Sequence, residues 1–556
     1  MNFGDTCSSK PKDIANMFAN FFKSVYNQDV IDPNMTLGLS SVNNNIDLHD
    51  IDISIDEVKN KLLSLKSSFN PGPDGIPSFF LTQCASSLAW PIWILYSKSL
   101  TSGTCPDIWK QSYVIPLYKS GDKKDVTNYR PISIIAALCK GLEAIISDTL
   151  TRSYAKVLTP HQHGFLPGKS TVTNLAIYNE YIIDALEEAA QVDAVYLDFC
   201  KAFDRVNHAL LLKKLKIYGI RGSLHRWLAS YLLNRTQKIS VKGFLSDAIS
   251  IPSGVPQGSH IGPILFLIFI NDLALSLNFV RFLFFADDLK IFIKVNDLAD
   301  CQAMQYTLIK ITNWCSENSM QLNNKKCKQI TFSRKKSTIK FSYSIDNQIL
   351  EAVSEIRDLG IIFNSTLSFV KHIDYVIDKS FRVSGFIRRM TADFHSIIAI
   401  RKLFITMVRP ILEYGILIWF PSYAIHETRL ERVQRKFCNY LMFKMGLNKS
   451  NYNYNQRLAI TELETLTQRK LKFELKFAYK LFNNQIDSAE FLSLFNFRVP
   501  LVHTRNQDTI LCSFKRTNLG YNTSVVNRIG LAVNNLVDID IFSCSQHMFN
   551  NYLRRL

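Results

Sequence analysis

The chain has 556 residues, 47% of them hydrophobic, which is enough material for several packed domains and excludes disorder throughout. Its formal charge of +18 favours a polyanionic partner, either nucleic acid or an acidic membrane. Eleven scattered cysteines without a CxxC pair predict reduced thiols, not a disulfide framework or a zinc knuckle. The N-terminus has no apolar signal core and no apolar run is long enough to cross a bilayer, so we expect neither secretion nor membrane insertion.

The first predicted element is an amphipathic helix near the N-terminus. Apolar residues between Ile14 and Val25 recur at intervals of three and four, which predicts one buried face. The stretch from Asn27 to Asp50 lacks Lys and Arg and is predicted to be a linker. A second helix is expected after Ser54, because Glu57 follows at the spacing of a capping box. The apolar residues expected to face inward from it are Ile55, Val58, Leu62 and Leu65.

A strand-like run from Ser112 to Tyr118 leads into a basic loop that contains a Gly-Asp turn. Lys119 and Arg130 border this loop, an arrangement suited to gripping phosphates. A solvated charged hairpin is the alternative interpretation of the loop alone. A helix from Val172 to Leu186 follows a glycine-containing loop whose spacing is one residue short of a P-loop, so that motif is not predicted.

The first acidic segment is DAVYLDFCKAFDRVNH, which begins at Asp193. Its apolar residues alternate along a predicted buried strand, and Asp198 lies on the opposite face at the end of that strand, where a metal ligand would lie. Asp204, six residues later, is interpreted as a residue of a helix N-terminus. Further on, Gln257 and Gly258 belong to a Pro-Gln-Gly turn that allows close backbone approach to a ligand, and a buried helix is expected after it.

The second acidic segment is FVRFLFFADDLKIFI, from Phe279 to Ile293, which predicts a strand, a tight turn and a second strand. Asp287 and Asp288 occupy the turn. Two adjacent carboxylates in apolar surroundings remain ionised only if a cation holds them, and Mg²⁺ prefers oxygen ligands. A solvated Asp-Asp turn is the alternative for this segment alone. Together with Asp198, the turn is predicted to form half of a metal site.

After this hairpin the sequence predicts a helix from Ile309 to Leu322, then Lys326 as either a surface lysine or a proton donor, and a short strand from Glu355 to Phe363. Residues 371–450 contain 14 Lys or Arg and six Asp or Glu. One helix in this stretch is apolar on one side and basic on the other, which favours a surface that follows a nucleic-acid backbone over an ordinary solvated face. Its basic residues are Arg429, Arg432, Arg435 and Lys436. The last hundred residues are Asn-rich and are predicted to be helical, without an assignable motif.

In their order along the chain, these segments resemble the reverse transcriptases of non-LTR retrotransposons of the insect jockey-like (LINE) type. The resemblance covers roughly residues 55 to 370. The segments that carry it are NPGPDGIP, IPLYKSGD, NYRPIS, HGFLPGKST, AVYLDFCKAFDRV, SGVPQGSHIGPILF, FFADDLKIF, LNNKKC and RDLGIIF.

The resemblance implies an α+β right-hand polymerase fold with fingers, a palm built on an antiparallel sheet, a thumb, and a mainly helical C-terminal region. The fingers would come largely from about residues 55–190. The implied division is an N-terminal helix and linker (1–50), a helical extension next to the fingers (51–110), the reverse transcriptase domain (98–366), a basic helical thumb (370–450) and a C-terminal helical region (451–556).

The resemblance also assigns roles to individual residues. Asp198, Asp287 and Asp288 would bind two Mg²⁺ ions, with Mn²⁺ as a substitute, and Asp288 would be the second carboxylate of the turn. Nucleotide-binding roles fall to Lys119, Arg130, Phe203, Gln257, Gly258 and Lys326. Phe203 would exclude a 2′-hydroxyl group, Leu359 and Gly360 would form the primer grip, and Lys169 would contact nucleic acid. Two residues depart from the family pattern: His260 replaces a small or aliphatic residue, and Lys169 replaces a frequent arginine.

The expected function is RNA-directed DNA synthesis from a primer 3′-hydroxyl, primed at a genomic target. The expected partners are an RNA template, a DNA primer or nicked target DNA, dNTPs, an RNA-binding protein encoded by the same element and a separate endonuclease. We expect a separate endonuclease because few residues precede the fingers, and we expect the chain to work inside the cell, in the nucleus. A catalytically dead or co-opted nucleic-acid-binding protein is the alternative function. An RNA-templated RNA polymerase is disfavoured by Phe203 and Ala286.

Overall fold

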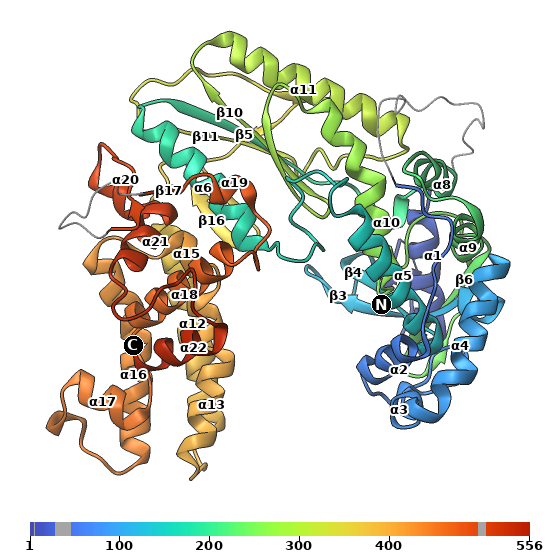
Figure 1. The fold of residues 1–556 in the computed structure, drawn as a ribbon, viewed down its shortest axis with the longest axis horizontal. Coiled ribbons are helices and arrows are strands. Elements are labelled where there is room, and N and C mark those ends of the chain that lie inside the picture. Colours follow the sequence, from blue (N-terminus) through green and yellow to red (C-terminus); the bar gives the residue numbers. More distant parts are fainter. Residues whose placement is uncertain (5, 28–45, 499–507) are drawn as a thin grey trace.

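The computed structural model describes residues 1–4, 6–27, 46–498 and 508–556, so most of the predicted linker lies outside the described residues. These residues form an arch (Figure 1). A central β-sheet bridges an N-terminal lobe and a C-terminal lobe, each of them rich in helices. The fold is therefore a mixture of helices and strands, as expected for the α+β class.

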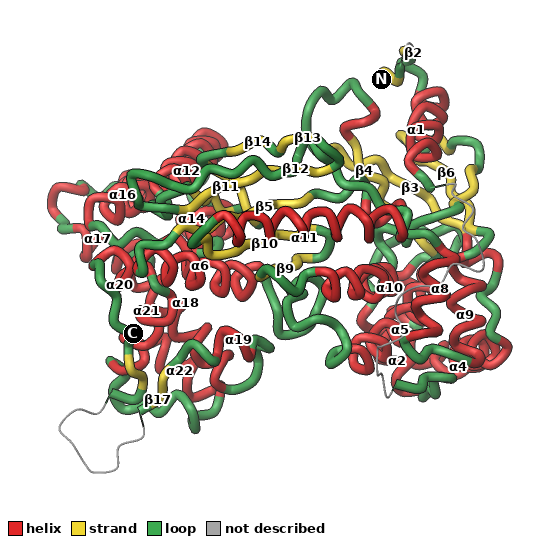
Figure 2. Tube along the Cα trace, turned by 90° about the horizontal axis from the view of Figure 1, so that it is seen from above, coloured by secondary structure: helices red, strands yellow, loops and turns green. Residues whose placement is uncertain are grey.

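The central sheet contains five strands in the order β14-β11-β5-β10-β9. Figure 2 shows these strands side by side, seen from above. β5 and β10 are antiparallel neighbours, with Leu197 opposite Leu289, and β14 is parallel to β11. The sheet thus joins the two acidic segments of the sequence as adjacent strands. The strand bounds are β5 Gln191–Leu197, β9 Arg281–Phe285, β10 Asp288–Val295, β11 Lys328–Phe332 and β14 Glu351–Ala352.

Two long helices lie on opposite sides of the central sheet (Figure 1): α6 (Thr171–Glu187) and α11 (Leu298–Glu317). α6 begins with a capping box in which Ser170 and Thr173 exchange hydrogen bonds. A helix is present where one was predicted from Ile309 to Leu322, but both predicted ends were wrong, because α11 begins at Leu298 and ends at Glu317. Ile309 lies within α11 and is 49% exposed.

The N-terminal lobe contains a second sheet in the order β4-β3-β6-β7, with β8 also paired to β6. β6 and β8 come from residues beyond 230, whereas β3 and β4 come from residues 111–135, so this sheet combines segments from both sides of β5 in the sequence. A parallel pairing of β6 with β3 adds the later segment. α1 (Pro11–Val25) packs its apolar face on this sheet, against Val114 and Ile239. The strand bounds are β3 Gln111–Tyr118, β4 Tyr129–Ile135, β6 Arg235–Val241, β7 Phe244–Leu245 and β8 Ile249–Ile251.

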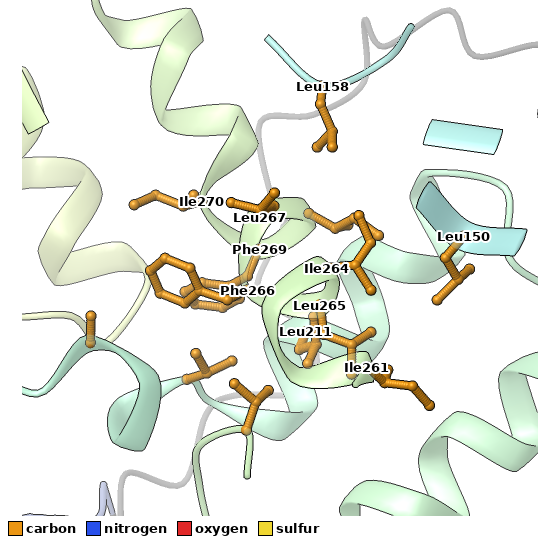
Figure 3. Close-up of a cluster of buried hydrophobic side chains, with 14 of the residues drawn as sticks. Leu150, Leu158, Leu211, Ile261, Ile264, Leu265, Phe266, Leu267, Phe269 and Ile270 are labelled. Atoms are coloured by element: carbon orange, nitrogen blue, oxygen red, sulfur yellow. The ribbon is translucent and has the colours of Figure 1, made fainter. Parts of the chain in front are cut away.

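The core of the N-terminal lobe surrounds α10, which is apolar on every side and is therefore buried at every residue except Pro263. Figure 3 shows its side chains among those of Leu150 from α5 and Leu211 from α8. In α2, Ser54 caps the helix as predicted and Val58 and Leu62 are buried, but Ile55 is 40% exposed because it lies in the first turn at the surface. The helix bounds are α2 Ile55–Ser64, α3 Ser78–Gln83, α4 Ala85–Ser102, α5 Ala137–Tyr154, α7 Ala202–Arg205, α8 His208–Ile217, α9 Gly222–Leu232 and α10 Ile261–Ile270.

The C-terminal lobe begins with a β-hairpin of β15 (Glu355–Asp358) and β16 (Ile361–Asn364). The prediction of one strand from Glu355 to Phe363 was wrong, because Leu359 and Gly360 both take positive φ angles and turn the chain. The helices that follow are α12 Val370–Met390, α13 Ile397–Met407, α14 Arg409–Glu413, α15 Ile416–Trp419, α16 Ala424–Lys444, α17 Tyr454–Thr461, α18 Leu466–Phe482, α19 Ala489–Leu492, α20 Asn518–Thr523, α21 Val525–Asn534 and α22 Gln546–Arg555.

The remaining strands are short two-residue pairs outside the two large sheets. Their bounds are β1 Asn2–Phe3, β2 Thr6–Cys7, β12 Ser344–Ile345, β13 Gln348–Ile349, β17 Asn496–Phe497 and β18 Ile510–Leu511. All eleven cysteines are free thiols. Among the described residues, no helix combines the length and the apolar character needed to cross a bilayer.

Candidate active site

The two acidic segments meet at one end of the central sheet. The β5–β10 ladder closes with Leu197 opposite Leu289, so extending the register by one residue sets Asp198 opposite Asp288. Asp287 lies in the two-residue turn between β9 and β10. Asp198 and Asp288 line a pocket of about 360 Å³, which also contacts Lys326 and Leu359. The pairing of β5 with β10 therefore assembles the carboxylates that the sequence placed ninety residues apart.

The pKa values of Asp287 and Asp288 are raised above the ordinary value of an aspartate. Burial, followed by the charges of Asp287, Asp358 and Asp198, raises the pKa of Asp288 to about 6. Burial and the charge of Asp198 also raise the pKa of Asp287, and the cationic Arg130 and Lys119 oppose this shift. The ionised forms of both side chains are thus less favoured than in water, and a bound cation would counteract this shift.

The donor atoms of these residues determine which metal ion they suit. Within the described residues, no group of three or more His, Cys, Asp or Glu side chains is already arranged to hold one. The donor set nevertheless fits Mg²⁺, because Asp198, Asp287 and Asp288 supply only oxygen atoms and their charges interact with one another. The residues present therefore match the chemistry of a magnesium ion.

Cationic side chains face these carboxylates from two directions. Lys326, which precedes β11, places its Nζ 3.3 Å from Asp198 Oδ2. Lys119 and Arg130 come from the paired ends of β3 and β4 in the N-terminal lobe. Burial and the neighbouring charges of Arg130 and Lys326 lower the pKa of Lys119, while Asp198 opposes that shift. This combination of acidic and basic groups could hold a triphosphate beside the carboxylates.

The predicted nucleotide floor is supported by the core of the N-terminal lobe. The ring of Phe203 in α7 stacks on that of Phe266 in α10, with 4.3 Å between ring centroids. Gln257 joins two segments, since its Nε2 donates to Asp204 Oδ1 at 2.8 Å and its carbonyl accepts from Ser133 N at 2.8 Å. Gly258 has φ 120°, and a Cβ there would lie 2.7 Å from the Ser133 carbonyl oxygen.

Asp204 makes a tertiary contact that the sequence interpretation did not include. It lies in the first turn of α7, as expected, but its side chain is buried and accepts the hydrogen bond of Gln257. Burial raises the pKa of Asp204 to about 6. Its position six residues after Asp198 could have indicated that it lies near the acidic site, but the sequence contains no signal for its contact with Gln257, about fifty residues away.

The remaining predicted contacts fall into two groups. Leu359 and Gly360 form the β15–β16 turn, and the hydroxyl of Tyr414, which sequence reasoning missed, donates to the Leu359 carbonyl at 2.8 Å. Arg432, Arg435 and Lys436 are exposed on α16.

Three other residues singled out in the sequence form hydrogen bonds or an ion pair with other parts of the protein. Arg429 pairs with Asp374. Lys169 Nζ donates to the Pro160 carbonyl oxygen at 2.6 Å. His260 has an exposed side chain, and its backbone N–H donates to Glu143 Oε2 at 2.8 Å.

A second polar cluster was also missed. Lys290 of β10 is buried and pairs with Asp358 at the end of β15, and Tyr196 of β5 also donates to Asp358. A lysine within an apolar strand signals a buried partner, but it does not say which residue that partner is. The cluster ties the strands that carry the acidic residues to the β15–β16 hairpin.

Comparison with known proteins identifies this region. Residues 121–363 match the family described as "Reverse transcriptase (RNA-dependent DNA polymerase)", and the match includes Asp198, Asp287 and Asp288. Residues 121–363 are a reverse transcriptase domain. Both acidic segments of the reverse transcriptase domain lie in the central sheet, and Lys326 and the β15–β16 turn fall inside the match as well.

Relatives that match up to 69% of this chain agree with this identification. It is 26% identical over 404 residues to the probable RNA-directed DNA polymerase from transposon BS of Drosophila melanogaster, covering 69% of this chain and 44% of the relative. It is also 26% identical over 404 residues to the RNA-directed DNA polymerase from mobile element jockey of the same species, covering 69% and 43%.

A third relative is the Pol polyprotein from the type-1 retrotransposable element R2 of Popillia japonica, 30% identical over 245 residues, covering 42% of this chain and 34% of the relative. The chain thus spans less than half the length of these relatives. The resemblance to non-LTR retrotransposon reverse transcriptases is confirmed.

Proposed function

We propose that the chain is the RNA-directed DNA polymerase of a non-LTR retrotransposon, which adds dNTPs to a primer 3′-hydroxyl. The observation that carries the proposal is the convergence of Asp198 with Asp287 and Asp288 at the end of adjacent strands, within the reverse transcriptase domain. In this proposal the central sheet is the palm, the N-terminal lobe contains the fingers, and α12 to α16 form the thumb.

The proposed site works by positioning and electrostatics. Asp198, Asp287 and Asp288 would hold two Mg²⁺ ions, or Mn²⁺ in their place, and the bound metals would supply activation of the 3′-hydroxyl and charge stabilisation on the phosphates. Lys119 and Arg130 neutralise the triphosphate from the fingers side. Lys326, 3.3 Å from Asp198, is placed to donate a proton to the leaving pyrophosphate.

Other residues of the chain hold the substrates in place. Phe203, braced by Phe266, closes the space beneath the sugar and excludes a 2′-hydroxyl group. Gln257 and Gly258 form the floor of the nucleotide pocket, and the β15–β16 turn with Leu359 and Gly360 holds the primer end. Exposed cations on α16 contact the nucleic-acid backbone.

The biological setting is part of the same proposal. Synthesis begins at a nicked chromosomal target in the nucleus, with the RNA of the element as template. An endonuclease activity supplies the nick, and an RNA-binding protein encoded by the element accompanies the template.

The test is primer extension with the purified chain, an RNA template, an annealed DNA primer, Mg²⁺ and dNTPs. We expect products that extend to the end of the template and that disappear when the RNA is digested beforehand. If the chain bound the primer–template but extended nothing across a range of metal and salt concentrations, a nucleic-acid-binding protein without catalysis would replace this proposal.

A further inference from the structure

The turn that carries the metal-binding carboxylates has a strained backbone. β9 and β10 are joined by the two residues Ala286 and Asp287, and Ala286 has φ 57°. Hairpin turns that need a positive φ at this position normally use glycine, because a Cβ is disfavoured there. Such a conformation is costly for a residue with a Cβ and persists only when neighbouring groups hold it.

The side chain of Gln162 holds this turn. Its Oε1 accepts from the backbone N–H of Ala286 at 2.9 Å, and its Nε2 donates to the carbonyl of the same residue at 3.2 Å. Its Oε1 also accepts from Gly164 N at 2.8 Å. Gln162 is 2% exposed, so water does not compete for these bonds. One amide group thus satisfies both polar groups of the strained residue.

The backbone around Gln162 holds the side-chain amide of this residue close to the Ala286 turn. It lies beside β9 as a short parallel bridge, in which His163 N donates to the Phe284 carbonyl and Phe284 N donates to the His161 carbonyl, each at 3.0 Å. Gly164 allows the approach, since a Cβ there would lie 2.3 Å from Ala286 N. Backbone and side chain therefore clamp the same turn.

We infer that Gln162 is a positioning residue for the metal site: it fixes the Ala286 turn and so aims Asp287 and Asp288. The inference rests on the proposed function for its catalytic meaning, but the geometric claim stands apart from it. A side chain that orients metal ligands from outside the site typically changes metal affinity or activity by about 10- to 100-fold when it is replaced.

Two substitutions separate this role from simple packing. Gln162→Met keeps the length of the side chain and removes all three hydrogen bonds. Gln162→Glu keeps the acceptor but, when ionised, places an oxygen against the Ala286 carbonyl. Protonation restores a donor at that point, so the activity of Gln162→Glu relative to the unmutated chain should rise as pH falls from 8 to 6.

The chain supplies a matched control in Gln191. This residue is also 2% exposed, and its amide makes the same reciprocal pair of bonds with one backbone residue, Ile339, each at 2.9 Å. It lies at the start of β5, at the opposite end of the strand from Asp198. Gln191→Met therefore removes equivalent buried bonds without touching the turn.

The experiment measures three quantities on the full chain: amide hydrogen exchange of the segment that contains Ala286, Mn²⁺ affinity by electron paramagnetic resonance, and primer extension. Asp198→Asn identifies the Mn²⁺ bound at the carboxylates. For Gln162→Met we expect faster exchange in that segment, Mn²⁺ affinity weaker by about tenfold or more and extension reduced by a similar factor. Gln191→Met should leave all three unchanged.

The outcomes distinguish this inference from the proposed function. Unchanged exchange and Mn²⁺ affinity in Gln162→Met, or equal losses in Gln191→Met, would overturn the positioning role. A flat pH profile for the relative activity of Gln162→Glu would also count against it. If the unmutated chain extended no primer while Gln162→Met still showed faster exchange and weaker Mn²⁺ binding, the proposed function would fail and the inference would stand.

Discussion

Phe203 depends for its position on packing against the rings of two neighbouring segments. Its ring stacks on Phe266, which belongs to the buried α10, and meets the ring of Phe165 edge-on with centroids 6.1 Å apart. The side chain is therefore held on two sides, and in the proposed function it would present a stiff surface to the sugar. A smaller residue would open space there and leave α10 in place.

We predict that Phe203→Val increases incorporation of ribonucleotides relative to deoxyribonucleotides by about tenfold or more, because the space beneath the sugar would then accept a 2′-hydroxyl. Single-nucleotide extension with matched rNTP and dNTP pairs measures the ratio, and the dNTP rate of the same variant serves as the control. An unchanged ratio with normal dNTP incorporation would mean that Phe203 does not select the sugar.

At the scale of elements, α16 combines a buried apolar face with a row of cations. Leu430, Val433 and Phe437 are buried as predicted. The exposed cations are partly ordered, since Arg435 lies over the ring of Tyr454 and Lys436 over that of Phe381. Arg429 differs from them because Asp374 neutralises its charge.

We predict that neutralising Arg432, Arg435 and Lys436 together makes nucleic-acid binding less dependent on salt. Each lost phosphate contact should lower the slope of log affinity against log salt by about 0.7 to 0.9, so a change of about 2 is expected. Titrations of a primer–template at several salt concentrations give the slope. Arg429→Gln is the matched control and should change the slope little; an equal effect, or no effect of the triple substitution, would argue against α16 as a binding surface.

α6 is a second element that contacts two parts of the structure. One side faces the central sheet, and the other forms hydrogen bonds with the C-terminal region. Glu180 of α6 is buried and accepts hydrogen bonds from Ser524 Oγ and Val525 N at the start of α21. Burial, opposed by these bonds, raises the pKa of Glu180 to about 7. Because its folded pKa lies above its ordinary value, the stability it contributes is complete below about pH 4.5 and is lost as pH rises through 7.

We predict that Glu180→Gln is more stable than the unmutated chain above pH 7, with an advantage of at most about 3 kcal/mol that disappears toward pH 4.5. The amide can still accept from Val525 N and can donate to Ser524. Differences in melting temperature across this pH range measure the effect. A difference that does not vary with pH would show that Glu180 is ionised in the folded protein at all of these pH values.

Glu187, on the same helix, serves as the control with the opposite sign. Burial raises its pKa, but hydrogen bonds from Thr517 and the charge of Arg334 outweigh burial and lower the pKa below its ordinary value. Glu187→Gln should therefore be less stable than the unmutated chain at neutral pH, and the deficit should shrink as pH falls through the usual range of a glutamate.

For the whole molecule, the central sheet at the top of the arch (Figure 1) carries the carboxylates. Lys119 and Arg130 of the N-terminal lobe act on Asp287, and the β15–β16 turn of the C-terminal lobe lines the same pocket as Asp198 and Asp288. Much of this could be predicted, because strand alternation and turn residues are local: Asp198 at a strand end, the Asp287–Asp288 turn and the buried α10 all follow from short windows of sequence. Contacts between distant segments could not be predicted. Such contacts depend on tertiary pairing, which leaves no periodic pattern in the sequence. Examples are the contacts of Gln162 with Ala286, Asp204 with Gln257 and Lys290 with Asp358.

The most direct test of the central claim is single-turnover primer extension by Asp287→Asn. We predict a loss on the order of a thousandfold or more, because the substitution removes a charged metal ligand while preserving size. Asp346→Asn is the matched control, since Asp346 is an exposed aspartate in the β12–β13 hairpin turn, where asparagine is well tolerated, and it should extend normally. Extension by Asp287→Asn at the unmutated rate would contradict the assignment of the Asp198, Asp287 and Asp288 cluster as the catalytic centre.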